Sequence, residues 1–247
     1  MRKYLSAAVL ILGIVSTGSV LASGQPHWSY QGDTAPQFWG NIDPAFSMCS
    51  AGKSQSPVDL KAFVESELVP LGIKYSASGK EVINNGHAIQ VNYEPGSIAA
   101  VGEHSYELKQ FHFHSPSENT IAGKSFPLEA HFVHADAAGN LAVIAVMYEE
   151  GPINGELEKA WKKMPVSAGG KDSLEAAMDA AALLPADKDY YRFNGSLTTP
   201  PCSEGVLWIV MKKYGTVSRE QIEKFVATMK GPNNRPVQPL NARVVME

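Results

Sequence analysis

Two histidines, His112 and His114, stand one residue apart in the stretch QFHFH at 110–114. Alternate side chains of a β-strand lie on the same face, so both imidazoles and Gln110 should share one face. Two imidazoles this close on a rigid strand can bind one metal cation, and Gln110 could accept the second N–H of His112. The alternative is a pair of core histidines that are satisfied by hydrogen bonds.

A third histidine comes from the stretch EAHFVH at 129–134. In an extended segment His131 and His134 face opposite sides, so only one of them can join the first pair. His131 shares its face with Glu129, whose carboxylate could accept the second N–H of His131. We therefore expect His131 to complete the metal site and His134 to lie in the core. Three imidazoles leave zinc a fourth position for water, which is the arrangement of a catalytic zinc site.

The elements that must position these histidines are mostly short strands separated by turn residues. Strands are predicted at 81–83, 88–93, 106–114, 128–135, 141–148 and 205–212. Three segments predict helices instead: 155–164, an alanine-rich run from Asp172 that ends before Pro185, and a capping box that begins at Ser218. No repeat or linker divides the chain. The pattern predicts a single, predominantly β domain with a large, mostly antiparallel sheet and peripheral helices.

The first 22 residues differ in composition from the rest of the chain. Two basic residues precede an apolar run over 5–15, and Val20 and Ala22 are small residues at the −3 and −1 positions of a cleavage site. This pattern is typical of a secretory signal peptide that is cut after Ala22. The apolar run is shorter than a bilayer span needs, which disfavours a membrane anchor. We therefore expect an exported protein, periplasmic or secreted, that is soluble once 23–247 is released.

Charge and cysteine content fit this expectation. The formal net charge is −4 and becomes −6 when the two basic residues of the signal peptide are removed. There is no basic stripe, which argues against nucleic acid and anionic membranes as partners. An oxidising compartment favours pairing of Cys49 with Cys202 over two buried free thiols.

Several blocks taken together resemble the alpha-class carbonic anhydrases, specifically their exported bacterial branch. The blocks are HWSY, NNGHAIQV, QFHFH followed by SEN, EAHFVH, GSLTTPPCSEGVLWIV and NNRPVQPLNAR. They come in the family's order and cover nearly all of 23–247. The resemblance implies one domain around a strongly twisted sheet of about ten strands. It also implies zinc bound by His112, His114 and His131, and reversible hydration of carbon dioxide to bicarbonate and a proton.

The resemblance implies further roles. Thr198 would accept a hydrogen bond from zinc hydroxide and donate its own proton to Glu118, which orients the hydroxide for attack. His87 would carry the proton out of the site. The substrate pocket would consist of Val133, Val143, Leu197, Thr199, Val206 and Trp208, and ordered water would be held by Tyr30, Asn85 and Gln90. Cys49 and Cys202 match a disulfide of many exported members, and cis peptide bonds are expected before Pro57 and Pro201.

The sequence also departs from the family. The segment between His114 and His131 is shorter than in the animal enzymes, Asn119 stands where they usually have histidine, and Lys109 occupies a rim position that is often apolar. None of these departures touches an expected zinc ligand. Two alternatives remain for the function, a catalytically silent binding module on the same fold and a zinc esterase. A homodimer also remains open.

Overall fold

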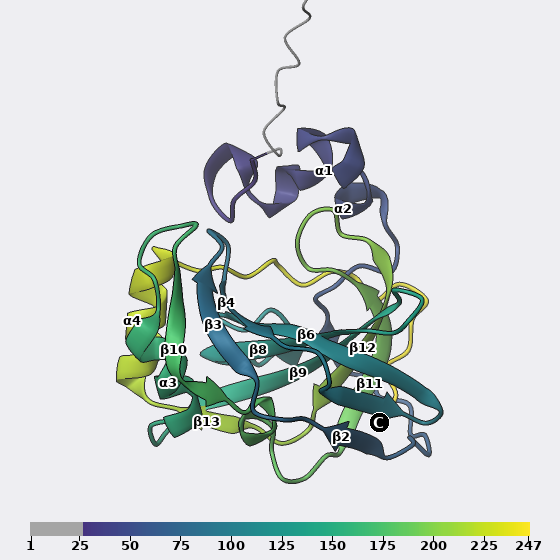
Figure 1. The fold of residues 1–247 in the computed structure, drawn as a ribbon. Helices are drawn as coiled ribbons and strands as arrows, with labels where there is room; N and C mark the ends of the chain where they lie inside the picture. Colours follow the sequence, from purple (N-terminus) through teal and green to yellow (C-terminus); the bar gives the residue numbers. More distant parts are fainter. Residues whose placement is uncertain (1–26) are drawn as a thin grey trace, which may run out of the picture.

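The structure is a computed structural model that describes residues 27–247, and the expected signal peptide lies outside them. Figure 1 shows a large sheet that curves through the molecule, with helices at its margins. The sheet has eleven strands, and a second sheet has two. The predicted predominantly β fold is confirmed.

Each of the six predicted strands matches a strand of the large sheet. Its members are β2 (Leu71–Lys74), β3 (Gly79–Asn84), β4 (Ile89–Tyr93), β5 (Ile98–Val101), β6 (His104–His114), β8 (Leu128–Ala135), β9 (Leu141–Glu150), β10 (Lys171–Met178), β11 (Tyr190–Ser196), β12 (Glu204–Met211) and β13 (Gly215–Val217). The main order is β10-β3-β4-β6-β8-β9-β12-β11. β9 pairs in parallel with β12 and β13, and the other pairs are antiparallel. The small sheet pairs β1 (Asp59–Leu60) with β7 (Thr120–Ile121).

Alternation along the strands sends side chains into two apolar clusters. On β9, Ile144 and Val146 belong to the larger cluster, and Val143 and Ala145 belong to the other. Phe113 of β6 lies in the larger cluster, where its ring packs against a helical tryptophan with centroids 4.9 Å apart. The histidines of β6 therefore face away from this larger core, as predicted.

Two of the three predicted helices are confirmed. In α3 (Gly155–Lys163), the side chain of Asn154 accepts hydrogen bonds from the first backbone amides, and Trp161 is buried. In α4 (Arg219–Met229), Ser218 and Gln221 form the predicted capping box. No helix within residues 27–247 has the length and apolar character that crossing a membrane requires.

The helix predicted from Asp172 to before Pro185 is wrong. This segment forms β10, followed by a single 3-10 turn, η4 (Ala180–Leu183). Lys171, Asp172 and Ser173 pair with Ile83, Val82 and Glu81 of β3. The alanines favour a helix locally, but the edge of β3 offers backbone hydrogen bonds that satisfy the segment as a strand, and this tertiary pairing overrides the propensity.

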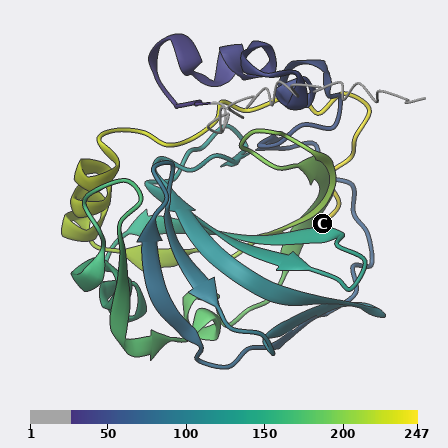
Figure 2. The ribbon, with the colours of Figure 1, turned by 45° about the horizontal axis from the view of Figure 1, so that its top comes forward.

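Residues 27–52 form a layer of short helical turns that we call the N-terminal cap. It includes α1 (Trp39–Ile42) and α2 (Met48–Ala51), and it lies across one end of the sheet (Figures 1 and 2). The predicted disulfide between Cys49 and Cys202 is confirmed, and it ties the cap to the loop between β11 and β12. The peptide bonds before Pro57 and Pro201 are cis, as expected, and so is the one before Pro116.

Candidate metal centre

The pairing of β6 with β8 brings the three predicted ligands together. His112 lies directly opposite His131, and His114 is two residues further along the same face of β6. The register between the strands shifts between Leu108 and Gln110, and it is regular from Gln110 onward. Two separate strands, rather than one local motif, therefore supply the histidines.

The three imidazoles surround a common point. One ring nitrogen from each lies within 4.8 Å of those from the other two. His114 and His131 are buried, whereas His112 is partly exposed. This arrangement suits a single cation that is approached from the side of His112.

The other nitrogen of each ring is held in place. Nδ1 of His112 lies 2.9 Å from Oε1 of Gln110, and Nε2 of His131 lies 2.9 Å from Oε1 of Glu129. Both contacts are those proposed from strand alternation. Nδ1 of His114 instead donates to the backbone carbonyl of Asn233, at 2.7 Å.

The hydrogen bonds to Gln110 and Asn233 assign a proton to Nδ1 of His112 and of His114, so Nε2 of each of these rings carries a lone pair. His131 differs, because the 2.9 Å contact of its Nε2 with Glu129 is close but is not aligned as a hydrogen bond. Among residues 27–247, the buried Nε2 atoms of His114 and His131 have no hydrogen-bond partner. Three oriented imidazole lone pairs form the donor set that catalytic zinc binds. The residues present therefore fit zinc.

Electrostatics favour the form of these imidazoles that binds metal. Burial lowers the pKa of His112 well below its usual value, and the neighbouring His114 and His131 lower it further. Burial, followed by His114, does the same to the pKa of His131. Neutral imidazoles are the form that binds a metal.

Glu118 lies beside the histidines and is almost fully buried. Its Oε1 accepts a hydrogen bond from the backbone N–H of Arg235 at 2.7 Å, and its Oε2 lies 3.5 Å from Nε2 of His114. Burial raises the pKa of Glu118 well above its usual value, and the Arg235 amide and the nearby Thr198 side chain act in the opposite direction. Within residues 27–247, Oε2 of Glu118 has no hydrogen-bond partner, which leaves it able to accept from the neighbouring hydroxyl of Thr198.

Glu129 is also buried and receives several hydrogen bonds. Its Oε2 accepts the backbone N–H groups of Glu118 and Asn119 at 2.7 and 2.9 Å, and its Oε1 accepts the side-chain amide of Asn119 at 2.8 Å. Burial raises the pKa of Glu129 to about 6, and these bonds lower it. Asn119, where the animal enzymes usually have histidine, therefore helps to fix the carboxylate that faces His131.

One apolar wall borders the histidines. The ring of Trp208 meets the ring of His131 edge-on, with centroids 4.9 Å apart, and Trp208 pairs with Val143 across β12 and β9. The members of the wall share one cluster, which includes Val133, Val143, Leu197, Val206 and Trp208. The structure therefore brings these five expected pocket residues together on the histidine face.

Comparison with known proteins assigns the family. Residues 34–247 match the family described as eukaryotic-type carbonic anhydrase. The chain belongs to this family of enzymes. It is 49% identical over 241 residues to a carbonic anhydrase of Neisseria gonorrhoeae, and the match covers 97% of this chain and 95% of that protein.

Solved structures of carbonic anhydrases have the same fold. One is a hyperthermostable enzyme from an active hydrothermal vent chimney, 57% identical with a TM-score of 0.88, covering 90% of this chain and 99% of that one. Another is the alpha-carbonic anhydrase of Thermovibrio ammonificans in complex with the inhibitor sulfanilamide. It is 50% identical with a TM-score of 0.89, and the match covers 91% of this chain and 100% of that one. Alpha carbonic anhydrases use zinc, which agrees with the donor set described above.

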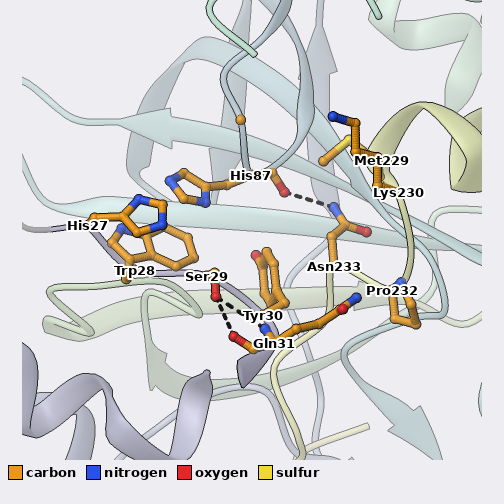
Figure 3. Close-up of a pocket in the computed structure, with 11 residues that line it drawn as sticks. His27, Trp28, Ser29, Tyr30, Gln31, His87, Met229, Lys230, Pro232 and Asn233 are labelled. Atoms are coloured by element: carbon orange, nitrogen blue, oxygen red, sulfur yellow. Dashed lines mark hydrogen bonds between the residues drawn. The ribbon is translucent and has the colours of Figure 1, made fainter. Parts of the chain in front are cut away.

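A cavity of about 150 Å³ connects the metal-binding face with the expected proton path. Its lining includes Tyr30, Asn85, His87, Gln90, Gln110, His112, His114 and Thr199. A neighbouring pocket of about 260 Å³, shown in Figure 3, shares Tyr30 and His87 with it. The residues expected to hold water and to move protons thus lie between the histidines and the rim.

His134 lies on the opposite face of β8, in the core. Its Nδ1 is 3.3 Å from the backbone carbonyl of Ala142, and its Nε2 hydrogen-bonds the hydroxyl of Tyr75. Asn233 and Arg235 were missed as contributors to the site. Their block, NNRPVQP, contributed to the resemblance, but nothing in its local pattern indicates that its backbone meets His114 and Glu118.

Proposed function

We propose that this chain catalyses the reversible hydration of carbon dioxide to bicarbonate and a proton. The observation that carries this proposal is the set of three clustered imidazoles from β6 and β8, two of them hydrogen-bonded through their second nitrogen and the third facing the carboxylate of Glu129. We assign zinc to His112, His114 and His131. When bound, zinc makes hydroxide available as a nucleophile near neutral pH, as is established for this family.

Glu118 and Thr198 supply orientation. Because the Arg235 amide donates to Oε1 of Glu118, Oε2 remains for the hydroxyl of Thr198. A threonine hydroxyl that donates to this carboxylate can only accept from the reacting group. It therefore selects one orientation of the nucleophile, with a lone pair aimed at the substrate.

The apolar wall suits carbon dioxide. Carbon dioxide has no hydrogen to donate, so an apolar surface can bind it. Water gains few hydrogen bonds at such a surface and competes poorly for it. Val143, Val206 and Trp208 are almost fully buried, and Val133 and Leu197 are partly exposed. We infer that these residues form the substrate pocket, with Thr199 beside bicarbonate.

His87 moves the proton from the site to the buffer. Burial, followed by the nearby His27, lowers the pKa of His87, so its imidazole is neutral near pH 7 and ready to accept. Tyr30, Asn85 and Gln90 hold the intervening water. In the described part of the chain the buried hydroxyl of Tyr30 has no hydrogen-bond partner, which supports this role because buried hydroxyls are generally satisfied by protein or water.

Residues 1–22 are a signal peptide by this proposal, and the enzyme works in the periplasm or outside the cell. The disulfide supports export, since disulfides persist in oxidising compartments. Mass determination of the exported protein tests the cleavage after Ala22. A mature protein that retains residues 1–22 would contradict it.

Stopped-flow measurement of carbon dioxide hydration tests the catalytic proposal directly. Zinc is removed with a chelator and added back in steps. We expect the hydration rate to rise in proportion to zinc and to stop at about one zinc per chain. Full zinc binding without hydration would instead support a silent binding module. A higher kcat/KM for an activated ester than for carbon dioxide would support an esterase.

A further inference from the structure

Arg235 is a charged residue in the interior, with 1% of its surface exposed. Its guanidinium donates to Oε1 of Gln55 at 2.9 Å, to the carbonyl of Ser56 at 2.7 Å and to the carbonyl of Cys49 at 2.9 Å. It also lies 5.7 Å from the ring centroid of Trp39. Every one of these partners belongs to the N-terminal cap or to the segment that directly follows it.

No carboxylate among residues 27–247 comes within 4.0 Å of this guanidinium. The charge of Glu118 favours the charged guanidinium from a greater distance, but burial outweighs it and lowers the pKa of Arg235 to about 10, so the charge is costly to desolvate. Stability alone therefore gives a weak reason for an arginine at this position. The geometry of its contacts gives a stronger one.

The backbone of the same residue reaches the reaction centre. The N–H of Arg235 donates to Oε1 of Glu118, while the carboxylate of Glu118 lies beside His114. The segment from 232 to 240 has no helix or strand to fix it. Figure 2 shows this C-terminal segment running beneath the cap. Hydrogen bonds of Asn233 with His114 and Ser115 anchor the segment two residues before Arg235. The guanidinium contacts add the anchor at Arg235 itself, the residue whose amide reaches Glu118.

Gln55 extends the connection to the loop that carries Thr198. Its Oε1 accepts from Arg235, and its Nε2 donates to the carbonyl of Cys202 at 3.0 Å. The N–H of Cys202 in turn donates to the carbonyl of Thr199 at 2.8 Å. The guanidinium of Arg235 therefore anchors the residue whose amide binds Glu118 and, through Gln55, is connected to the loop that carries Thr198.

We propose that Arg235 is a positioning residue for carbon dioxide hydration, because its guanidinium fixes the placement of Glu118 relative to Thr198. The proposal rests on the roles given to these two residues under the proposed function. A lysine at 235 keeps the positive charge but loses the planar fork that reaches three separate oxygens. Small displacements of orienting groups reduce rates strongly, by up to about 100-fold for about 1 Å.

Arg243 is a matched control. Its guanidinium also donates to backbone carbonyls, those of Leu240, Asn194, Gln55 and Pro239. It makes no hydrogen bond to Glu118 or to either cysteine within residues 27–247. Arg243→Lys therefore removes bonds to backbone carbonyls at a partly buried position, one of them on Gln55, and it touches neither the side chain of Gln55 nor the amide that binds Glu118.

The experiment measures kcat/KM for carbon dioxide per bound zinc, at a temperature well below the Tm of every variant. We expect Arg235→Lys to lower kcat/KM by about 10- to 100-fold, and Arg243→Lys by less than about twofold. Equal effects of the two substitutions would overturn the proposal. If Arg235→Lys does not fold, Gln55→Met carries the test, and an unchanged kcat/KM for that variant would overturn it.

A double-mutant cycle separates positioning from general damage. If Arg235 acts through Glu118, Arg235→Lys should have little further effect in a Glu118→Gln background. A reduction by the same factor in both backgrounds would show that Arg235 does not act through Glu118. Should Glu118→Gln itself retain full activity, the role of Glu118 in the proposed function fails, which is distinguishable from failure of the role of Arg235.

Discussion

The imidazole of His87 lies parallel to the indole of Trp28, with ring centroids 3.6 Å apart and planes 9° apart. Trp28 in turn meets Tyr30 and Trp39 edge-on, with centroids 5.5 and 5.0 Å away. Figure 3 shows His87, Trp28 and Tyr30 together at the rim, with His27 alongside. The N-terminal cap therefore fixes both the position and the environment of the side chain proposed to carry protons.

Trp28→Ala should change the pH dependence of turnover. Burial is the main cause that lowers the pKa of His87, and removing the indole exposes the imidazole, so this pKa should rise toward its usual value. His87 accepts a proton only when neutral, so the low-pH limb of kcat in weak buffer should move to higher pH. Trp28→Phe, which keeps a ring, should shift it less. An unmoved limb in Trp28→Ala would mean that Trp28 does not set this pKa.

His87→Ala should slow turnover in weak buffer by on the order of 100-fold. Its kcat/KM for carbon dioxide should stay nearly unchanged, because the proton leaves after the substrate has reacted. Added imidazole should restore part of kcat. His104→Ala is the control, since His104 is exposed and lines a different pocket from His87. If both variants respond alike to buffer, the shuttle role of His87 is rejected.

Strand alternation was enough to predict which histidines share a face. It also separated His131 from His134, because the period of two is a local property of the chain. The contacts of Asn233 and Arg235 with the site were not predictable from pattern, since they join residues more than a hundred positions apart. Local propensity also misled at Asp172, where pairing with β3 decided the structure. The turns of the N-terminal cap are too short to show any periodicity.

His131→Ala should lose nearly all bound zinc and nearly all hydration activity, because two imidazoles are a poor site for a catalytic metal. Gln110→Ala should weaken zinc binding about 10- to 100-fold, since it releases the ring of His112. His134→Gln is the matched control on the same strand, and it should keep one zinc per chain. Zinc counted on purified protein checks all three. Retention of zinc and activity by His131→Ala would refute the ligand assignment.

Loss of the disulfide should destabilise the fold and disturb the Thr198 loop. The bridge joins residues 153 positions apart, and chain entropy alone assigns such a loop about 5 kcal/mol. We expect Cys49→Ser to lower Tm and, at temperatures near that Tm, turnover as well. Differential scanning calorimetry with parallel activity measurements checks this. Unchanged melting and turnover would show that the bridge has neither role.

Stability should fall in acid partly through His134. Burial lowers the pKa of His134 to about 4, whereas an unfolded histidine titrates near about 6.5. Between about pH 4 and pH 6.5, the unfolded chain therefore binds a proton at His134 more readily than the folded chain does. Stabilisation from the neutral, buried imidazole is fully present above about pH 6.5. It is lost as pH falls toward 4, by on the order of 3 kcal/mol.

His134→Gln removes this titration and leaves the zinc ligands unchanged. The free energy of unfolding, measured by urea denaturation at pH 7 and pH 4.5, should therefore decline less in the variant than in the wild type. Comparing the two proteins cancels the acid sensitivity of every other group, including the zinc ligands. Equal declines would mean that His134 is not held neutral by burial beside Tyr75, and that the acid sensitivity of the fold arises elsewhere.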